Sequence, residues 1–125
     1  MSVQRIDRNS VKRILDGYVD EKHSVVIKFY GAECGYCHNL APFYKELSDK
    51  YSDIYFYAFN MDEGDGFEEK YNFYGVPTIC YVHTDGPDTK FHFMSDPDEP
   101  DSGNTGTWYK PQELIDFLET NRRVK

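Results

Sequence analysis

The chain has 125 residues, a length that predicts a single domain (residues 1–125) with one buried core. Its net charge is −8. The acidic charge argues against nucleic-acid binding, because phosphate backbones repel it. No apolar run approaches the roughly 20 residues that cross a bilayer, and residues 1–5 are polar, unlike the start of a secretory signal. We therefore expect a cytoplasmic protein without a membrane partner.

Hydrophobic periodicity predicts the first elements. Residues 10–18 place apolar side chains at helical spacing, with Ser10 as the N-cap. Residues 24–30 are almost continuously apolar and β-branched, which is typical of a strand buried on both faces. A second helical stripe covers residues 37–51, and Pro42 inside it should kink the helix.

The second half of the chain continues this alternation. Strands are expected at residues 54–60, 78–83 and 90–94, and the last has the polar–apolar alternation of an antiparallel edge strand. Residues 64–72 form a short helix or an irregular connection, and Pro111 lies in the first turn of a final helix. This order predicts an α/β domain with a mixed central sheet flanked by helices.

Two of the three cysteines form the pattern Cys34-Gly-Tyr-Cys37 between a predicted strand and a predicted helix. A thiol at a helix N-terminus is stabilised as the thiolate by free backbone N–H groups and the helix dipole. The thiolate is the nucleophile in disulfide exchange, so Cys34 is expected to attack and the more buried Cys37 to resolve the mixed disulfide. The redox-active pair needs no further cofactor.

A zinc site is the alternative use of these thiols. Cys34, Cys37 and His38 could supply three of the about four ligands that structural zinc needs. No second close pair of cysteines or histidines appears, so no metal site is predicted.

Three stretches of the chain resemble the thioredoxin and protein disulfide isomerase family. Residues 25–42 resemble its strand, active-site turn and proline-containing helix, residues 60–62 its Asn-x-Asp segment, and residues 74–78 its Gly-Val-Pro-Thr loop. The resemblance covers about residues 11–118 and implies a thioredoxin-like fold.

The resemblance also implies a binding site for an extended substrate chain. Pro77 would follow a cis peptide bond and face the dithiol, and the Val76 backbone would pair with the substrate by β-type hydrogen bonds. Gly75 belongs to the same loop, while Gly35 allows a close approach of the substrate and Tyr36 contributes to its site.

Three positions near the dithiol are expected to modulate it. Glu33 replaces the family's usual Trp, and a carboxylate beside Cys34 opposes thiolate formation. Tyr36 occupies the position that tunes the redox potential, and His38 lies on the helix surface just past Cys37. These replacements leave the direction of the reaction open.

Lys28 occupies the place of the family's buried acid, which is thought to relay a proton. Two alternatives stay open: Lys28 extends to solvent without a role, or it electrostatically favours the Cys37 thiolate.

Residues 96–107 form an acidic loop insertion, preceded by Met94 where the family has Gly. The loop either overhangs the substrate groove and selects a partner or is simply solvated. Cys80 is expected to be a buried, small hydrophobic residue, with a regulatory thiol as the alternative. The other histidines (His23, His83 and His92) show no ligand spacing and are expected to be surface or structural residues.

The leading function is a monomeric reductase of disulfide-containing proteins that is itself re-reduced by a reductase. The alternatives are a protein disulfide oxidase or isomerase and a thioredoxin-like binding subunit. The absence of an evident signal peptide favours the reducing direction.

Overall fold

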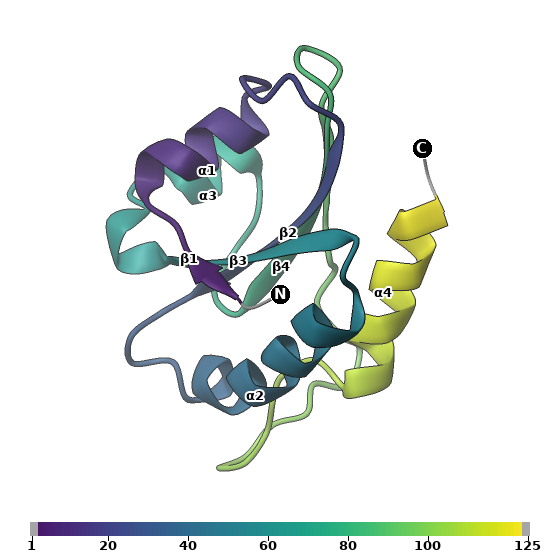
Figure 1. Ribbon diagram of the computed structural model, residues 1–125. Coiled ribbons are helices and arrows are strands. Elements are labelled where there is room, and N and C mark those ends of the chain that lie inside the picture. Colours follow the sequence, from purple (N-terminus) through teal and green to yellow (C-terminus); the bar gives the residue numbers. More distant parts are fainter. Residues whose placement is uncertain (1–2, 124–125) are drawn as a thin grey trace.

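The computed structural model describes residues 3–123, and Figure 1 shows how its elements are arranged. The strands are β1 (Gln4–Arg5), β2 (His23–Tyr30), β3 (Ile54–Asn60), β4 (Thr78–Thr84) and β5 (Lys90–Phe93). The helices are α1 (Arg8–Leu15), α2 (Gly35–Lys50), α3 (Phe67–Tyr71) and α4 (Pro111–Arg123), with a short 3₁₀ turn, η1 (Met61–Glu63), after β3.

The strands form one mixed sheet in the order β1-β3-β2-β4-β5. Strand β2 runs parallel to β3 and antiparallel to β4, and β5 is the antiparallel edge strand. The predicted fold class and edge strand are confirmed. Strand β1 was not predicted, because two residues carry no periodic signal; it pairs in parallel with β3.

Helices cover both faces of the sheet (Figure 1). Helices α1 and α3 pack on one face, and α2 and α4 on the other. Side chains of a strand alternate between faces. In β2, Val25, Ile27 and Phe29 belong to the core on the α1 side, while Val26 belongs to the core on the α2 side. Lys28 therefore points from the sheet toward α2, the helix that begins at the dithiol.

The predicted N-cap of the first helix is wrong by three residues. The N-cap is Asp7, whose carboxylate accepts a hydrogen bond of 2.8 Å from the backbone N–H of Ser10. A carboxylate at this place satisfies a free N–H and favours the positive end of the helix. The helix ends at Leu15, and Gly17 follows with a φ of +84°.

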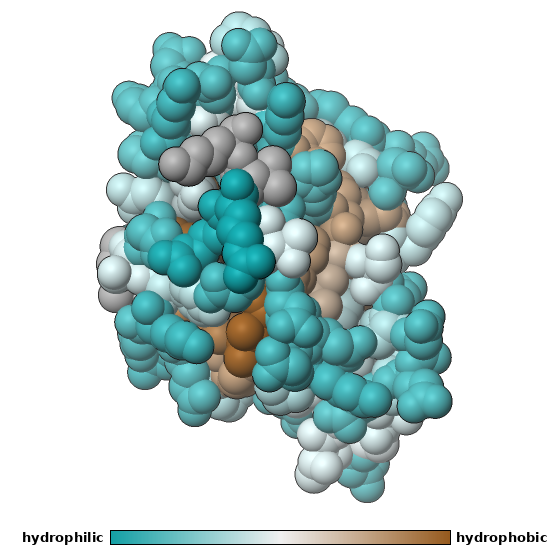
Figure 2. Space-filling model, turned by 90° about the vertical axis from the view of Figure 1, so that its right-hand side faces the viewer, coloured by the Kyte–Doolittle hydropathy of each residue, from teal (hydrophilic) through white to brown (hydrophobic). Residues whose placement is uncertain are grey.

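One face of the molecule is mostly polar. Figure 2 shows hydrophilic side chains over most of one face, with hydrophobic ones visible in a narrower band between them. None of the helices in residues 3–123 has the length and apolar character needed to span a membrane.

Candidate active site

Cys34 and Cys37 are joined by a disulfide at the start of α2, just after the turn that follows β2. Their Cα atoms lie 5.3 Å apart, so the two-residue spacing brings the sulfurs together within one helical turn. Cys34 is half-buried, and Cys37 is only 2% exposed. The predicted division into an accessible and a buried cysteine is confirmed.

Cys34 is the N-cap of α2. Its Sγ accepts a hydrogen bond of 3.2 Å from the backbone N–H of Cys37. No acidic residue lies in the first turn of the helix. The same N–H and the positive helix end would stabilise a thiolate on Cys34 after reduction, which makes this sulfur the better nucleophile.

The loop before β4 lies beside the dithiol. The Val76–Pro77 peptide bond is cis, as the resemblance implied. A Cβ placed on Gly31 would lie 3.5 Å from Val76 Cγ2 and 3.6 Å from Cys34 Cβ, so Val76 and Cys34 flank the same glycine. Within residues 3–123, neither the N–H nor the carbonyl of Val76 forms a hydrogen bond. Both groups are available to an extended peptide.

The backbone groups of Gly75, unlike those of Val76, are hydrogen-bonded. Its N–H donates to the Glu68 carboxylate at 2.6 Å, and its carbonyl accepts from the Thr78 hydroxyl at 2.8 Å. These bonds hold Gly75 at a φ of +74°, which favours glycine. Gly75 thus shapes the loop, and the free backbone groups are those of Val76.

The predicted modulating residues lie around the start of α2. Glu33 and Gly35 are exposed. His38 is also exposed, and its Nε2 donates to the Ala32 carbonyl at 2.8 Å, which ties the first turn of the helix to the turn before it. His38 therefore helps to hold the active-site turn.

Tyr36 contacts a residue that the sequence did not single out. Its ring packs against Trp108, with centroids 5.5 Å apart and planes tilted by 42°. Trp108 adopts a φ of +65° at the end of the acidic loop and pairs with Asp101 through two backbone hydrogen bonds of 2.9 Å. The loop is thus folded back on itself beside the dithiol.

Asn39 fastens this loop to α2. Its Nδ2 donates to the carbonyls of Asn104 at 3.1 Å and Gly106 at 2.8 Å. The loop projects past α2 in Figure 1. Much of the loop is exposed, as expected of a solvated loop, and Asn39 fastens its end to the active-site helix; selection of a partner by the loop stays a prediction.

Lys28 is only 6% exposed and does not extend to the outer surface, so the first of its two alternatives is wrong. Its Nζ lies over the ring of Tyr44, 4.9 Å from the centroid. Burial, and secondarily the charge of Arg5, lowers the pKa of Lys28 to about 8. An effect on the Cys37 thiolate stays a prediction.

Cys80 lies in the centre of β4 and is fully buried, as predicted. Burial raises the pKa of its thiol far above the ordinary value, which makes it inert as a nucleophile. Over residues 3–123, no group of three or more His, Cys, Asp or Glu side chains could hold a metal ion. His23 and His92 are exposed and His83 is half-buried.

A cis-proline loop, a disulfide at a helix N-terminus and a mixed five-stranded sheet together define a redox-dithiol protein of the α/β class. The family model that matches the chain is thioredoxin, over residues 8–97. The chain belongs to the thioredoxin family.

Curated relatives match parts of the chain. Thioredoxin 1 of Plasmodium falciparum is 33% identical over 64 residues, which cover 51% of this chain and 62% of that protein. A protein disulfide-isomerase of Schizosaccharomyces pombe is 32% identical over 68 residues, which cover 52% of this chain and 19% of that protein. The chain thus matches less than two thirds of the length of either relative.

Solved structures extend the likeness over nearly the whole fold. Spinach chloroplast thioredoxin f superposes with a TM-score of 0.69 at 18% identity, over 97% of this chain and 94% of that one. Thioredoxin f2, in a complex with ferredoxin:thioredoxin reductase, superposes with a TM-score of 0.70 at 23% identity, over 97% and 96% of the two chains. These likenesses establish the thioredoxin fold.

Proposed function

We propose that the chain is a thiol–disulfide oxidoreductase that reduces disulfides of protein substrates. The observation that carries the proposal is the Cys34–Cys37 disulfide at the N-terminus of α2, beside the unpaired backbone groups of Val76. One feature supplies the nucleophile and the other a surface on which a substrate strand can align.

The reaction proceeds by two exchanges. The Cys34 thiolate attacks one sulfur of a substrate disulfide, a Cys34–substrate bond forms, and the first substrate thiolate leaves. The Cys37 thiolate then attacks Cys34 Sγ, restores the Cys34–Cys37 disulfide and releases the second substrate thiolate. Two electrons pass from the dithiol to the substrate, and the described disulfide is the oxidised product of this cycle.

The cycle needs a donor that returns two electrons to Cys34 and Cys37. We propose a reductase in this role, supported by the thioredoxin f2 structure, which is a complex with ferredoxin:thioredoxin reductase. The dithiol carries the electrons itself, so no additional cofactor is invoked. We propose that the protein acts as a monomer in the cytoplasm. Thiols are kept reduced in this compartment, which suits the reducing direction.

A protein disulfide oxidase or isomerase is the second candidate. The match to the S. pombe isomerase supports it. The same two exchanges run in reverse in that case. The reduction potential separates the two directions.

The acidic loop gives the proposed enzyme a preference among substrates. Asp98 and Glu99 are exposed, and Trp108, which directly follows the loop, contacts the active-site residue Tyr36. We propose that substrates with basic residues flanking the disulfide are favoured, because the loop that Asn39 fastens to the active-site helix carries exposed acidic side chains.

Reduction of insulin tests the proposed activity. With dithiothreitol as the electron donor, the chain should accelerate insulin precipitation, and Cys34→Ser should abolish the acceleration. Cys80→Ala is the matched control, because it removes a buried thiol outside the site and should keep the activity. An unchanged rate with Cys34→Ser, or no acceleration by the parent chain, contradicts the proposal.

A further inference from the structure

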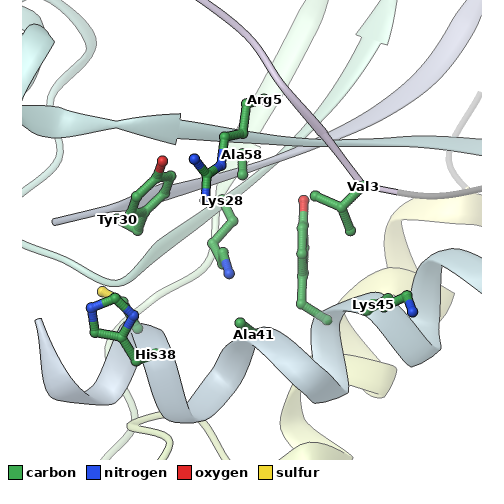
Figure 3. A pocket seen from close by; sticks show the side chains of 10 residues that line it. Val3, Arg5, Lys28, Tyr30, His38, Ala41, Lys45 and Ala58 are labelled. Carbon is green, nitrogen blue, oxygen red and sulfur yellow. The ribbon is translucent and has the colours of Figure 1, made fainter. Parts of the chain in front are cut away.

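A cavity of about 290 Å³ opens beside the buried cysteine, between the sheet and α2 (Figure 3). We call it the Lys28 cavity. It is just below the range of about 300–1,000 Å³ that is typical of small-molecule sites. Its walls come from β1, β2, β3 and α2, and the lining residues are Val3, Arg5, Lys28, Tyr30, Cys37, His38, Ala41, Tyr44, Lys45 and Ala58.

The charge of this lining is opposite to that of the chain. The protein carries a net charge of −8, yet among residues 3–123 no Asp or Glu lines the Lys28 cavity. Three cationic side chains do: Arg5 from β1, Lys28 from β2 and Lys45 from α2. Figure 3 shows the Lys28 side chain reaching from the sheet toward α2. The cavity is therefore a local positive site on an acidic protein.

The Lys28 ammonium has no anionic partner. Within residues 3–123, no hydrogen bond or ion pair involves its Nζ, which contacts only the ring faces of Tyr44 at 4.9 Å and Tyr30 at 5.8 Å. An unpaired buried charge is costly, and a nearby anion offsets that cost. The lowered pKa of about 8 still leaves the group mostly protonated at neutral pH. The Lys28 side chain is thus 94% buried and ends in a cavity, where an anion from solvent could neutralise its charge.

The remaining walls indicate what kind of anion fits. Val3, Ala41 and Ala58 are aliphatic, and Tyr30 and Tyr44 present ring faces to the cavity. Apolar walls gain free energy when they cover an apolar body, which inorganic phosphate lacks. We propose that the Lys28 cavity binds a small carboxylate with an apolar body, its carboxylate directed at Lys28 and Arg5.

Binding in the Lys28 cavity is coupled to the dithiol, because Cys37 lines the same space. In the disulfide, Cys37 is uncharged. After reduction its thiolate would be a second anion next to the bound carboxylate. The ligand therefore binds the oxidised form more tightly, and by reciprocity it stabilises the disulfide. This coupling, unlike the binding itself, rests on the proposed redox cycle.

Titration of the oxidised, full-length chain with benzoate, followed by amide NMR shifts, tests the site. We expect saturable shifts around Cys37 and Ala58, and at least about tenfold weaker binding by Lys28→Met. Arg5→Gln changes an exposed position of β1 and should weaken binding severalfold. This variant keeps the site testable even if Lys28→Met does not fold. Lys50→Met, at the other end of α2, should bind as the parent chain does.

Two further ligands decide the chemistry. Benzamide has the same ring without the charge and should not saturate. Inorganic phosphate should bind more weakly than benzoate, and tighter binding of phosphate would contradict the apolar-body claim. No saturable binding of benzoate, or equal binding by the parent chain, Lys28→Met and Arg5→Gln, would overturn the site.

The coupling has its own readout. The benzoate dissociation constant of the dithiothreitol-reduced chain should be severalfold higher than that of the oxidised chain, with both measured at the same pH near 8, where about half of Lys28 keeps its proton. Equal constants would overturn the coupling. Benzoate binding is measured on the oxidised protein, so a failure of insulin reduction would contradict the proposed function and leave the binding result standing.

Discussion

Trp108 packs against Tyr36, the residue directly before the buried cysteine Cys37, with ring centroids 5.5 Å apart. Trp108 is the only tryptophan of the chain and lies just beyond the acidic loop. This contact, together with the hydrogen bonds from Asn39 to the loop, joins the insertion to the dithiol. A change in the loop should therefore alter the kcat/KM of substrates that react at Cys34.

The charge of the loop should set substrate preference. The double variant Asp98→Asn, Glu99→Gln should reduce the kcat/KM ratio of a basic over an acidic disulfide peptide by about two- to fivefold at low salt. The difference should shrink at high salt, because exposed charges are screened. Asp88→Asn, on the β4–β5 turn, is the matched control. An unchanged ratio in the double variant would reject charge selection.

Removing the Asn39 side chain should release the loop. Asn39→Ala loses two hydrogen bonds to loop carbonyls, which should lower the free energy of unfolding by about 1–2 kcal/mol. Amide exchange should quicken at Asp101 and Trp108, whose backbones pair within the loop. Urea unfolding and hydrogen exchange measure the two effects. Gln112→Ala, which loses one exposed hydrogen bond to Asp116 on α4, should leave loop exchange unchanged.

The stability of the oxidised chain should rise with pH because of Lys28. Its pKa is about 8 when folded, against about 10.4 for an unfolded lysine, so between these values the unfolded chain binds more protons. The free energy of unfolding should therefore increase from pH 8 to about pH 10, by an amount on the order of 1–3 kcal/mol.

Comparison with Lys28→Met isolates this contribution from the tyrosines that titrate near the upper end of the range. The variant should lack the rise, whereas Lys50→Met, which removes an exposed lysine, should keep it. Urea unfolding of the three proteins at both pH values is the measurement. The same pH dependence in the parent chain and Lys28→Met would mean that the Lys28 pKa is not lowered.

Cys80 should be unreactive in the folded protein. It is fully buried, and the raised pKa of its thiol leaves almost no thiolate. The oxidised chain should release no thionitrobenzoate from Ellman's reagent under native conditions and one equivalent after denaturation in guanidinium chloride. A stoichiometric reaction of the native, oxidised chain would instead support the regulatory thiol.

The sequence alone predicted four of the five strands and the dithiol because their signals are local. The apolar runs of β2 and β3 and the Cys34–Cys37 spacing can be read from single short stretches, and the Gly75–Pro77 loop from its resemblance to the family. The predicted boundaries of β3 agree with the structure. The first helix was misplaced because Asp7 and Ser10 are both good N-caps, and only the backbone conformation distinguishes them.

The surroundings of the dithiol could not be predicted in the same way. Trp108 reaches Tyr36 from 72 positions away through a loop with no periodic pattern. Arg5 joins the Lys28 cavity only because the two-residue strand β1 pairs with β3. A lone tryptophan after an acidic insertion is the one signal that could have drawn attention to the first contact; the second has no signal in the sequence.

The reduction potential of the Cys34–Cys37 pair, measured at equilibrium with glutathione, tests the proposed reductase most directly. Alkylation of the free thiols at each glutathione ratio gives the fraction reduced, and Cys80→Ala removes the third thiol from the count. A value of about −270 mV is the result expected of a reductase. A value near about −180 mV would contradict the reducing direction and favour the oxidase or isomerase.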